Sequence, residues 1–142
     1  MPSLRARILL VDDEPAILET CQEILRIEGY TVDAVASGSA ALEAAMHTTY
    51  VLLVTDLKME GMDGLELLAE FQKRSPQTVT VMMTGYGTID SATEAVRLGA
   101  YEFLLKPVAV EDLKQAVTRC LERKRLSEID TLYHVGNELA LA

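Results

Sequence analysis

Residues 8–15 of the chain read Ile-Leu-Leu-Val-Asp-Asp-Glu-Pro. Four consecutive apolar residues are typical of a short strand that is buried on both faces of a sheet. Pro15 then opens a stretch in which apolar side chains recur at helical spacing as far as Glu28, and Gly29 can end that helix. Three carboxylates therefore lie where a buried strand passes into a helix.

The same alternation of strand and helix continues along the chain. Strands are expected at residues 8–11, 31–35, 51–54, 79–83 and 102–105, and helices at 15–28, 39–47, 63–74, 88–98 and from 110 onward. Asp63 and Glu66 have the spacing of a capping box at the start of the third helix. Strict alternation predicts an α/β fold with a doubly wound, five-stranded parallel sheet, because right-handed crossovers place helices on both faces. A closed barrel would need about eight such units.

Composition and charge narrow the class of protein. A chain of 142 residues with 49% hydrophobic and 25% charged residues is typical of one globular domain, here with a tail. Thirteen basic against twenty-two acidic residues give a net charge of −9, so direct binding to nucleic acid is not expected. No apolar run has the length of a membrane span. Cys21 and Cys120 are expected to be reduced, and the expected location is cytoplasmic.

Polar residues follow four of the five expected strands. They are Asp12, Asp13 and Glu14 after the first, Asp56 after the third, Thr84 after the fourth and Lys106 after the fifth. Ligands of open parallel sheets bind at this edge. Carboxylates without neighbouring His or Cys favour a hard divalent cation, and Mg²⁺ fits best because it joins carboxylates to phosphate oxygens. With a nucleophilic carboxylate, an ammonium and a hydroxyl, the set has the parts needed for phosphoryl transfer to Asp.

These motifs resemble the response-regulator receiver domain of two-component signalling. The resemblance rests on residues 10–15 (LVDDEP), 54–56 (VTD), 59–64 (MEGMDG), 83–87 (MTGYG) and 103–107 (FLLKP). It covers residues 5–122, and residues 84–107 look most like receivers of transcriptional activators that control an ATPase domain. It implies a flavodoxin-like sheet of order 2-1-3-4-5. It also implies a signalling module, phosphorylated by a histidine kinase, that catalyses only its own phosphorylation and slow dephosphorylation.

The resemblance also implies a role for individual residues. Asp56 would accept the phosphoryl group, Lys106 would hold a phosphoryl oxygen, and Thr84 and Phe103 would be the switch residues. The implied ligands of Mg²⁺ are Asp12 (largely through water), Asp13, Asp56 and the backbone carbonyl of Lys58. The Lys106–Pro107 peptide is typically cis in the family. Lys58 and Tyr86 occupy the two positions that tune phosphoryl lifetime, and their bulk predicts slow loss of the phosphoryl group.

Phosphorylation would change the surface formed by residues 88–98, the fifth strand and the last helix. That helix shows no Gly or Pro until Gly136, so residues 123–142 are expected to be a helical linker toward an output or sensor domain in a longer chain. The output could be an ATPase-type activator, a small-molecule-sensing module or a kinase module. A homodimer through the last two helices is a further expectation.

Three other functions share these residues. A Mg²⁺-dependent phosphohydrolase would use the same aspartyl chemistry, but no domain that would cover a substrate is evident in the sequence. A binding module that is never phosphorylated would not need the full set of Asp12, Asp13, Asp56, Thr84 and Lys106. A flavin-binding domain would favour Ser, Thr and Gly after the first strand, where this chain has acids.

Overall fold

A computed structural model describes the backbone of residues 7–85 and 89–141, and the side chains of residues 7–85 and 90–126. The strands are β1 (Arg7–Val11), β2 (Thr31–Val35), β3 (Leu52–Asp56), β4 (Val79–Thr84) and β5 (Glu102–Leu105). The helices are α1 (Pro15–Ile27), α2 (Gly38–His47), α3 (Gly64–Arg74), α4 (Ile89–Arg97) and α5 (Val110–Leu141). The predicted alternation of strands and helices is therefore confirmed.

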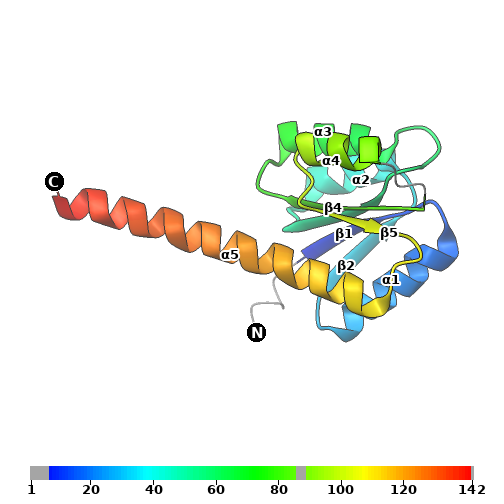
Figure 1. Cartoon of the computed structure of the whole chain (residues 1–142), viewed down its shortest axis with the longest axis horizontal. Coiled ribbons are helices and arrows are strands. Elements are labelled where there is room, and N and C mark those ends of the chain that lie inside the picture. Colours follow the sequence, from blue (N-terminus) through cyan, green and yellow to red (C-terminus); the bar gives the residue numbers. More distant parts are fainter. Residues whose placement is uncertain (1–6, 86–88, 142) are drawn as a thin grey trace.

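The five strands form one parallel sheet of order β2-β1-β3-β4-β5, as predicted. Helices α1 and α5 cover one face, and α2, α3 and α4 cover the other (Figure 1). In β1, Ile8 and Leu10 pack with the apolar cluster of α1 and α5, whereas Leu9 and Val11 pack with that of α2 and α3. Residues 8–11 of β1 are fully buried and alternate between the two faces, which explains why this run is continuously apolar.

Two strands extend further at their carboxyl ends than the sequence predicted. β3 ends at Asp56 rather than at residue 54, and β4 ends at Thr84 rather than at residue 83. The pairing of β3 with β4 continues to Asp56 opposite Met83, so hydrogen bonds to a neighbouring strand hold polar residues in the extended conformation. Strand length here is set by pairing across the sheet, which local polarity does not reveal.

Local sequence sets the starts of the helices whose first turns are described. Pro15 begins α1, and the Ser37 hydroxyl accepts a hydrogen bond from the Ala40 amide at the start of α2. The predicted capping box of α3 is confirmed. The Glu66 amide donates to Asp63 Oδ1 at 2.9 Å, and the Asp63 amide donates to Glu66 Oε1 at 3.2 Å. Such a box satisfies two amides that the helix itself cannot bond.

Helix α5 first packs on the sheet and then runs beyond it (Figure 1). Three basic residues tie its middle to the sheet. Arg119 forms a two-pronged ion pair with Glu102, the Arg123 guanidinium lies 5.3 Å from the centre of the Tyr101 ring, and Lys124 Nζ donates to the backbone oxygen of Gln77 at 2.8 Å. Contacts with the sheet layer thus continue two residues past the predicted domain boundary.

Both cysteines are free and buried, as predicted. Burial is the main cause that raises the pKa of the Cys21 thiol, and it raises the pKa of the Cys120 thiol to about 12. Both thiols are therefore protonated and unreactive near neutral pH. Within the described part of the chain, no helix combines the length and the hydropathy that crossing a bilayer requires.

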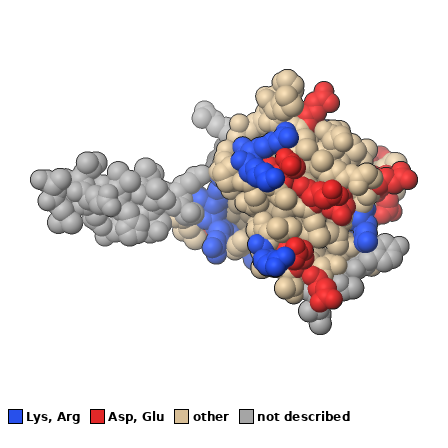
Figure 2. Space-filling view, turned by 90° about the horizontal axis from the view of Figure 1, so that it is seen from above, with Lys and Arg blue, Asp and Glu red and all other residues tan. Residues whose placement is uncertain are grey.

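Figure 2 looks onto the face of the molecule that carries α2, α3 and α4, where basic and acidic side chains lie next to one another. Two ion pairs account for part of this pattern. Arg74 pairs with Glu70 in α3, and Arg97 pairs with Glu94 in α4. On this face the described cations are thus interspersed with carboxylates rather than gathered into one basic surface.

Thr80 in β4 is fully buried, and among the described residues its hydroxyl has no hydrogen-bond partner. Thr80→Val replaces this hydroxyl with a methyl group of similar size. We expect the free energy of unfolding to rise by about 1 kcal/mol, because an unpaired polar group no longer has to be buried. Urea denaturation should show a higher midpoint with an unchanged m value.

The matched control for this prediction is Thr78→Val. Thr78 immediately precedes β4, two residues before Thr80. Thr78 is also buried, but its hydroxyl donates to the Tyr50 backbone oxygen at 2.8 Å and lies 2.7 Å from the Ser75 hydroxyl. We expect this control to lower the free energy of unfolding by about 1 kcal/mol. Equal effects of the two substitutions would show that the pairing of the hydroxyl does not decide the outcome.

Candidate functional site

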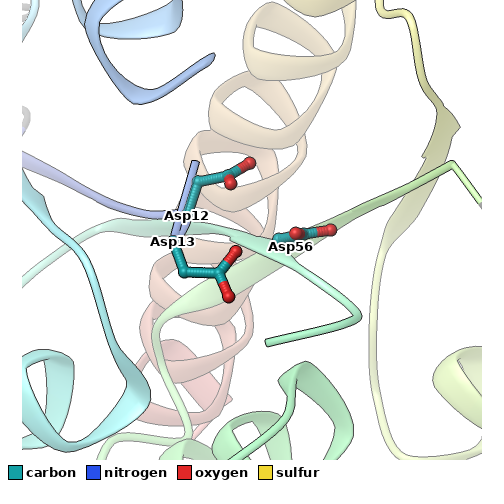
Figure 3. A group of neighbouring side chains, drawn as sticks. All are labelled: Asp12, Asp13 and Asp56. Atoms are coloured by element: carbon teal, nitrogen blue, oxygen red, sulfur yellow. The ribbon is translucent and has the colours of Figure 1, made fainter. Parts of the chain in front are cut away.

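Three aspartates meet at the carboxyl edge of the sheet. Asp12 and Asp13 follow β1, and Asp56 ends the neighbouring strand β3 (Figure 3). One carboxylate oxygen from each lies within 4.8 Å of the other two. Asp12 and Asp56 are buried, whereas Asp13 is exposed. The predicted cluster therefore forms because β1 and β3 pair side by side, with Val11 opposite Thr55.

Lys106 brings a single ammonium to this cluster from the end of β5. Its Nζ lies 2.8 Å from Asp12 Oδ2 and 3.2 Å from Asp56 Oδ2, and its side chain is 11% exposed. The Lys106 amide donates to the Thr84 backbone oxygen at 2.8 Å, which fixes the chain beside the end of β4. The following peptide, Lys106–Pro107, is cis, as the resemblance implied.

The charges at this edge do not balance. Burial is the largest cause that raises the pKa of Asp56, repulsion from Asp12 adds to it, and Lys106 opposes both. Burial lowers the pKa of Lys106, but the hydrogen bonds and charges of Asp12 and Asp56 outweigh it, so that pKa is raised overall. Lys106 is thus protonated, and the site has an excess of buried negative charge that a further cation would relieve.

The donor set fits a hard divalent cation. The cluster offers three carboxylates, and no His or Cys belongs to it among the described residues. Carboxylate oxygens select Mg²⁺, Mn²⁺ or Ca²⁺ rather than softer metals. Lys58, whose carbonyl was the predicted backbone ligand, lies two residues after Asp56 in the loop that leads to α3, and its side chain is exposed.

Two backbone amides fix the loop between β3 and α3 beside the cluster, one bonded to the Asp13 side chain and one to a backbone oxygen of the loop itself. The Glu60 amide donates to Asp13 Oδ2 at 3.3 Å, and the Gly64 amide donates to the Leu57 oxygen at 2.8 Å. These contacts place the start of α3 next to Asp56. The motif at residues 59–64 did not predict the Glu60 contact, because this contact depends on how the loop folds back.

The two predicted switch residues lie on adjacent strands. Thr84 ends β4 and is fully buried, and it stands opposite Leu105 of β5. Phe103 of β5 is half-buried and packs against the apolar cluster that includes Met82 and Ala95. Tyr86, the second residue predicted to tune phosphoryl lifetime, lies outside the described residues.

No role was predicted for Glu14, although its carboxylate follows β1 together with Asp12 and Asp13. Glu14 Oε1 lies 3.5 Å from Lys106 Nζ, and the side chain is 61% exposed. The two residues are 92 positions apart in the chain. The sequence indicated only that both residues follow strands whose ends meet at one edge of the sheet. This does not predict which residues at that edge contact each other.

Residues 8–118 match the family model described as the response regulator receiver domain. The chain belongs to this family. The family prediction is therefore confirmed, and the receiver domain occupies the part of the chain that forms the sheet and its covering helices.

Named relatives agree with this assignment. The chain is 38% identical over 118 residues to the transcriptional regulatory protein GlrR of Escherichia coli, and the match covers 83% of this chain and 27% of GlrR. It is 34% identical over 119 residues to the C4-dicarboxylate transport transcriptional regulatory protein DctD of Rhizobium meliloti, covering 84% and 26%. The chain thus spans about a quarter of the length of these relatives.

A solved structure supports the fold. A CheY-like response regulator receiver domain protein from Methanospirillum hungatei superposes with a TM-score of 0.83 at 32% identity, covering 86% of this chain and 98% of that one. The predicted flavodoxin-like fold is therefore confirmed. Membership of the receiver family implies phosphorylation by a partner kinase and Mg²⁺ binding in the acidic cluster. The relatives are transcriptional regulators, in agreement with the predicted subgroup.

Proposed function

We propose that this receiver domain takes a phosphoryl group from a histidine kinase onto Asp56 with the help of Mg²⁺. The proposal rests on the environment of the Asp56 carboxylate. Its carboxylate is buried, Asp12 and Asp13 lie close to it, and Lys106 Nζ lies 3.2 Å from its Oδ2. A nucleophile that has both a nearby cation and a candidate metal site is suited to attack a phosphoryl group.

In the proposed transfer, an oxygen of Asp56 attacks phosphorus, and the bond between phosphorus and the kinase's imidazole nitrogen breaks. Lys106 neutralises charge on the phosphoryl oxygens and releases Asp56 as it does so. Mg²⁺, held by Asp12, Asp13, Asp56 and the Lys58 carbonyl, would supply further charge neutralisation. The raised pKa of Asp56 supports the nucleophilic role, because a more basic carboxylate is a better nucleophile once it is ionised.

The domain catalyses only its own phosphorylation and slow dephosphorylation. Lys58 is exposed two residues after Asp56, which is compatible with a side chain that covers the acyl phosphate. Residues 5–122 constitute the receiver, and residues 123–142 are a linker toward an output domain in a longer chain. The greater length of the relatives supports this organisation. The proposal also includes a homodimer formed through the last two helices and a cytoplasmic location of the protein.

Switching is proposed to pass from Thr84 and Phe103 to the surface of α4, β5 and α5. Phosphorylation adds about −1.5 to −2 charges at the sheet edge, and Thr84 then moves toward the new oxygens while Phe103 follows. Two observations support this route. Thr84 and Phe103 lie on paired strands, and the ion pair of Glu102 with Arg119 joins β5 to α5.

Thr84→Ala tests the switch role separately from the chemistry. We expect the variant to form the Asp56 adduct at a rate within about threefold of wild type, because the nucleophile and Lys106 are unchanged. The change in amide chemical shifts of α4 and β5 upon phosphorylation should fall by about half or more, because the hydroxyl no longer stabilises the switched packing. Two-dimensional NMR before and after phosphorylation measures both states.

Thr118→Ala is the control, because Thr118 is exposed on α5 and its hydroxyl donates only to its own helix, at the Lys114 oxygen. It should leave the adduct and the shift changes as in wild type. Shift changes of full size in Thr84→Ala would contradict the switch role.

The function itself is tested by incubating the chain with Mg²⁺ and acetyl phosphate and recording an intact mass spectrum. We expect one phosphoryl adduct that is absent when EDTA is present, and peptide mapping should locate it at Asp56. Continuous release of phosphate without an adduct would favour the phosphohydrolase. Absence of both an adduct and release, with acetyl phosphate and with a kinase-derived phosphohistidine, would contradict the proposal.

A further inference from the structure

Glu14 occupies the N-cap position of α1, yet its side chain makes no capping hydrogen bond. The Glu14 amide donates to Asp12 Oδ1 at 2.9 Å, which holds the backbone against the cluster. Its carboxylate instead extends to Lys106, with Oε1 3.5 Å from Nζ. Glu14 therefore belongs to the acidic edge rather than to the helix end.

The position of Glu14 differs from that of the carboxylates beneath it. The side chains of Asp12 and Asp56 are 0% and 5% exposed, whereas that of Glu14 is 61% exposed. Because Glu14 is far more exposed than Lys106, which is 11% exposed and 3.5 Å away, its charge lies on the solvent side of Lys106. We call this solvent side of the site, formed by the loops after β1 and β3, the mouth, through which a phosphodonor would enter. The loops after β1 and β3 carry three other exposed charged residues, Asp13, Lys58 and Glu60.

A phosphodonor brings negative charge to this mouth. A fixed carboxylate there repels a free donor with an energy that rises in proportion to the charge of the donor. The same carboxylate attracts a divalent cation that approaches the cluster. A carboxylate at this place thus weakens the approach of an anionic donor and strengthens the binding of a divalent cation.

We propose that Glu14 selects phosphodonors by charge, slowing phosphorylation by free anionic donors and strengthening Mg²⁺ binding. The inference rests on the proposed phosphorylation of Asp56. Glu14 contacts Lys106 through its side chain, so its role is to position Lys106 and to set the electrostatic field at the mouth. Donors that carry more negative charge are disfavoured more strongly.

Two small phosphodonors of different charge test whether the effect of Glu14 depends on donor charge. Near pH 7 acetyl phosphate is a dianion, whereas phosphoramidate is a monoanion. At saturating Mg²⁺, we expect Glu14→Gln to speed adduct formation about threefold with phosphoramidate and about ninefold with acetyl phosphate, because the repulsion scales with donor charge. Raising the ionic strength from about 0.05 M to about 0.5 M should shrink both effects.

Two control variants accompany Glu14→Gln. Glu23→Gln makes the same change in net charge on an exposed position further along α1, and its rates should stay within about 1.5-fold of wild type. Glu14→Asp keeps the charge on a shorter side chain and should stay within about twofold of wild type.

Mg²⁺ affinity gives a readout that does not depend on phosphorylation. An NMR titration with Mg²⁺ alone should show binding to Glu14→Gln that is about threefold weaker or more, with Glu23→Gln unchanged. If Glu14 had a purely structural role, Glu14→Gln would not both speed the reaction with the more negative donor and weaken Mg²⁺ binding.

The outcomes separate this inference from the proposed function. If wild type forms the adduct but Glu14→Gln speeds both donors equally, or behaves like Glu23→Gln, the inference about Glu14 is overturned and the phosphorylation of Asp56 stands. If Glu14→Asp behaves like Glu14→Gln, charge is not the cause, and the inference is also overturned. If wild type forms no adduct with either donor at saturating Mg²⁺, both proposals fail.

Discussion

A receiver domain that carries Asp56→Asn is expected to form no phosphoryl adduct with acetyl phosphate and Mg²⁺, and at the same time to unfold at a higher urea concentration than wild type. The first effect follows because the amide has no anionic oxygen to attack phosphorus. The second follows because the substitution removes one of two buried like charges. Urea denaturation at pH 7 without Mg²⁺ should show a gain of about 1 kcal/mol.

The direction of this gain comes from the pKa of Asp56. Burial and the charge of Asp12 raise that pKa in the folded chain above its ordinary value, even though Lys106 opposes them. The folded state then holds the proton more tightly than the unfolded state, so ionisation of Asp56 destabilises the fold as the pH rises through the interval between the two pKa values. Above that interval the destabilisation is complete, and below it there is none.

The advantage of Asp56→Asn should therefore be largest at neutral pH and shrink as the pH falls to about 4 and below. Mg²⁺ at neutral pH should shrink it as well, because a cation that binds the folded wild type stabilises that state by mass action. Asp112→Asn, on an exposed residue of α5, provides the control and should retain the adduct and change stability by less than about 0.5 kcal/mol. A gain that is the same at neutral and acidic pH would contradict a buried, repelled Asp56.

The architecture and most of the candidate site could be predicted because both rest on short-range rules. Buried parallel strands need continuous apolar runs such as residues 8–11, and right-handed crossovers then determine the layers. The carboxyl ends of parallel strands meet at one edge, so Asp12, Asp56 and Lys106 were expected to lie together. The distances around Lys106 in the structure confirm that these three residues do.

Other features depend on contacts between distant parts of the chain. The extension of β3 to Asp56 requires pairing with β4, and an isolated polar residue gives no sign of it. The contact of Lys124 with the Gln77 oxygen extends the contacts of α5 with the sheet layer, and it depends on where a loop 47 residues earlier comes to rest. Glu14 does not cap α1, and its side chain lies next to Lys106, which is 92 positions away in the chain. Sequence periodicity carries no information about such pairs.

Gly64→Ala is expected to lower the free energy of unfolding by about 3 kcal/mol, because there is no room for a side chain where α3 begins. A Cβ at this position would overlap the backbone oxygen of Asp56, and it would lie 2.8 Å from Met82 Sδ and 2.9 Å from Cα of Leu57. The Met82 side chain can move aside, but the other two obstacles are backbone atoms of the segment that carries the proposed phosphoacceptor and cannot. Urea denaturation measures the loss.

The same substitution should also slow adduct formation with acetyl phosphate, since relief of the overlap has to displace either α3 or Asp56. Gly85→Ala is the matched control, because among the described residues a Cβ there would meet only Lys106 Cβ, at 3.9 Å, and its stability should stay within about 0.5 kcal/mol of wild type. A Gly64→Ala variant as stable as Gly85→Ala would show that α3 can shift freely against Asp56. The position of the carboxylate would then not depend on the close approach of this helix.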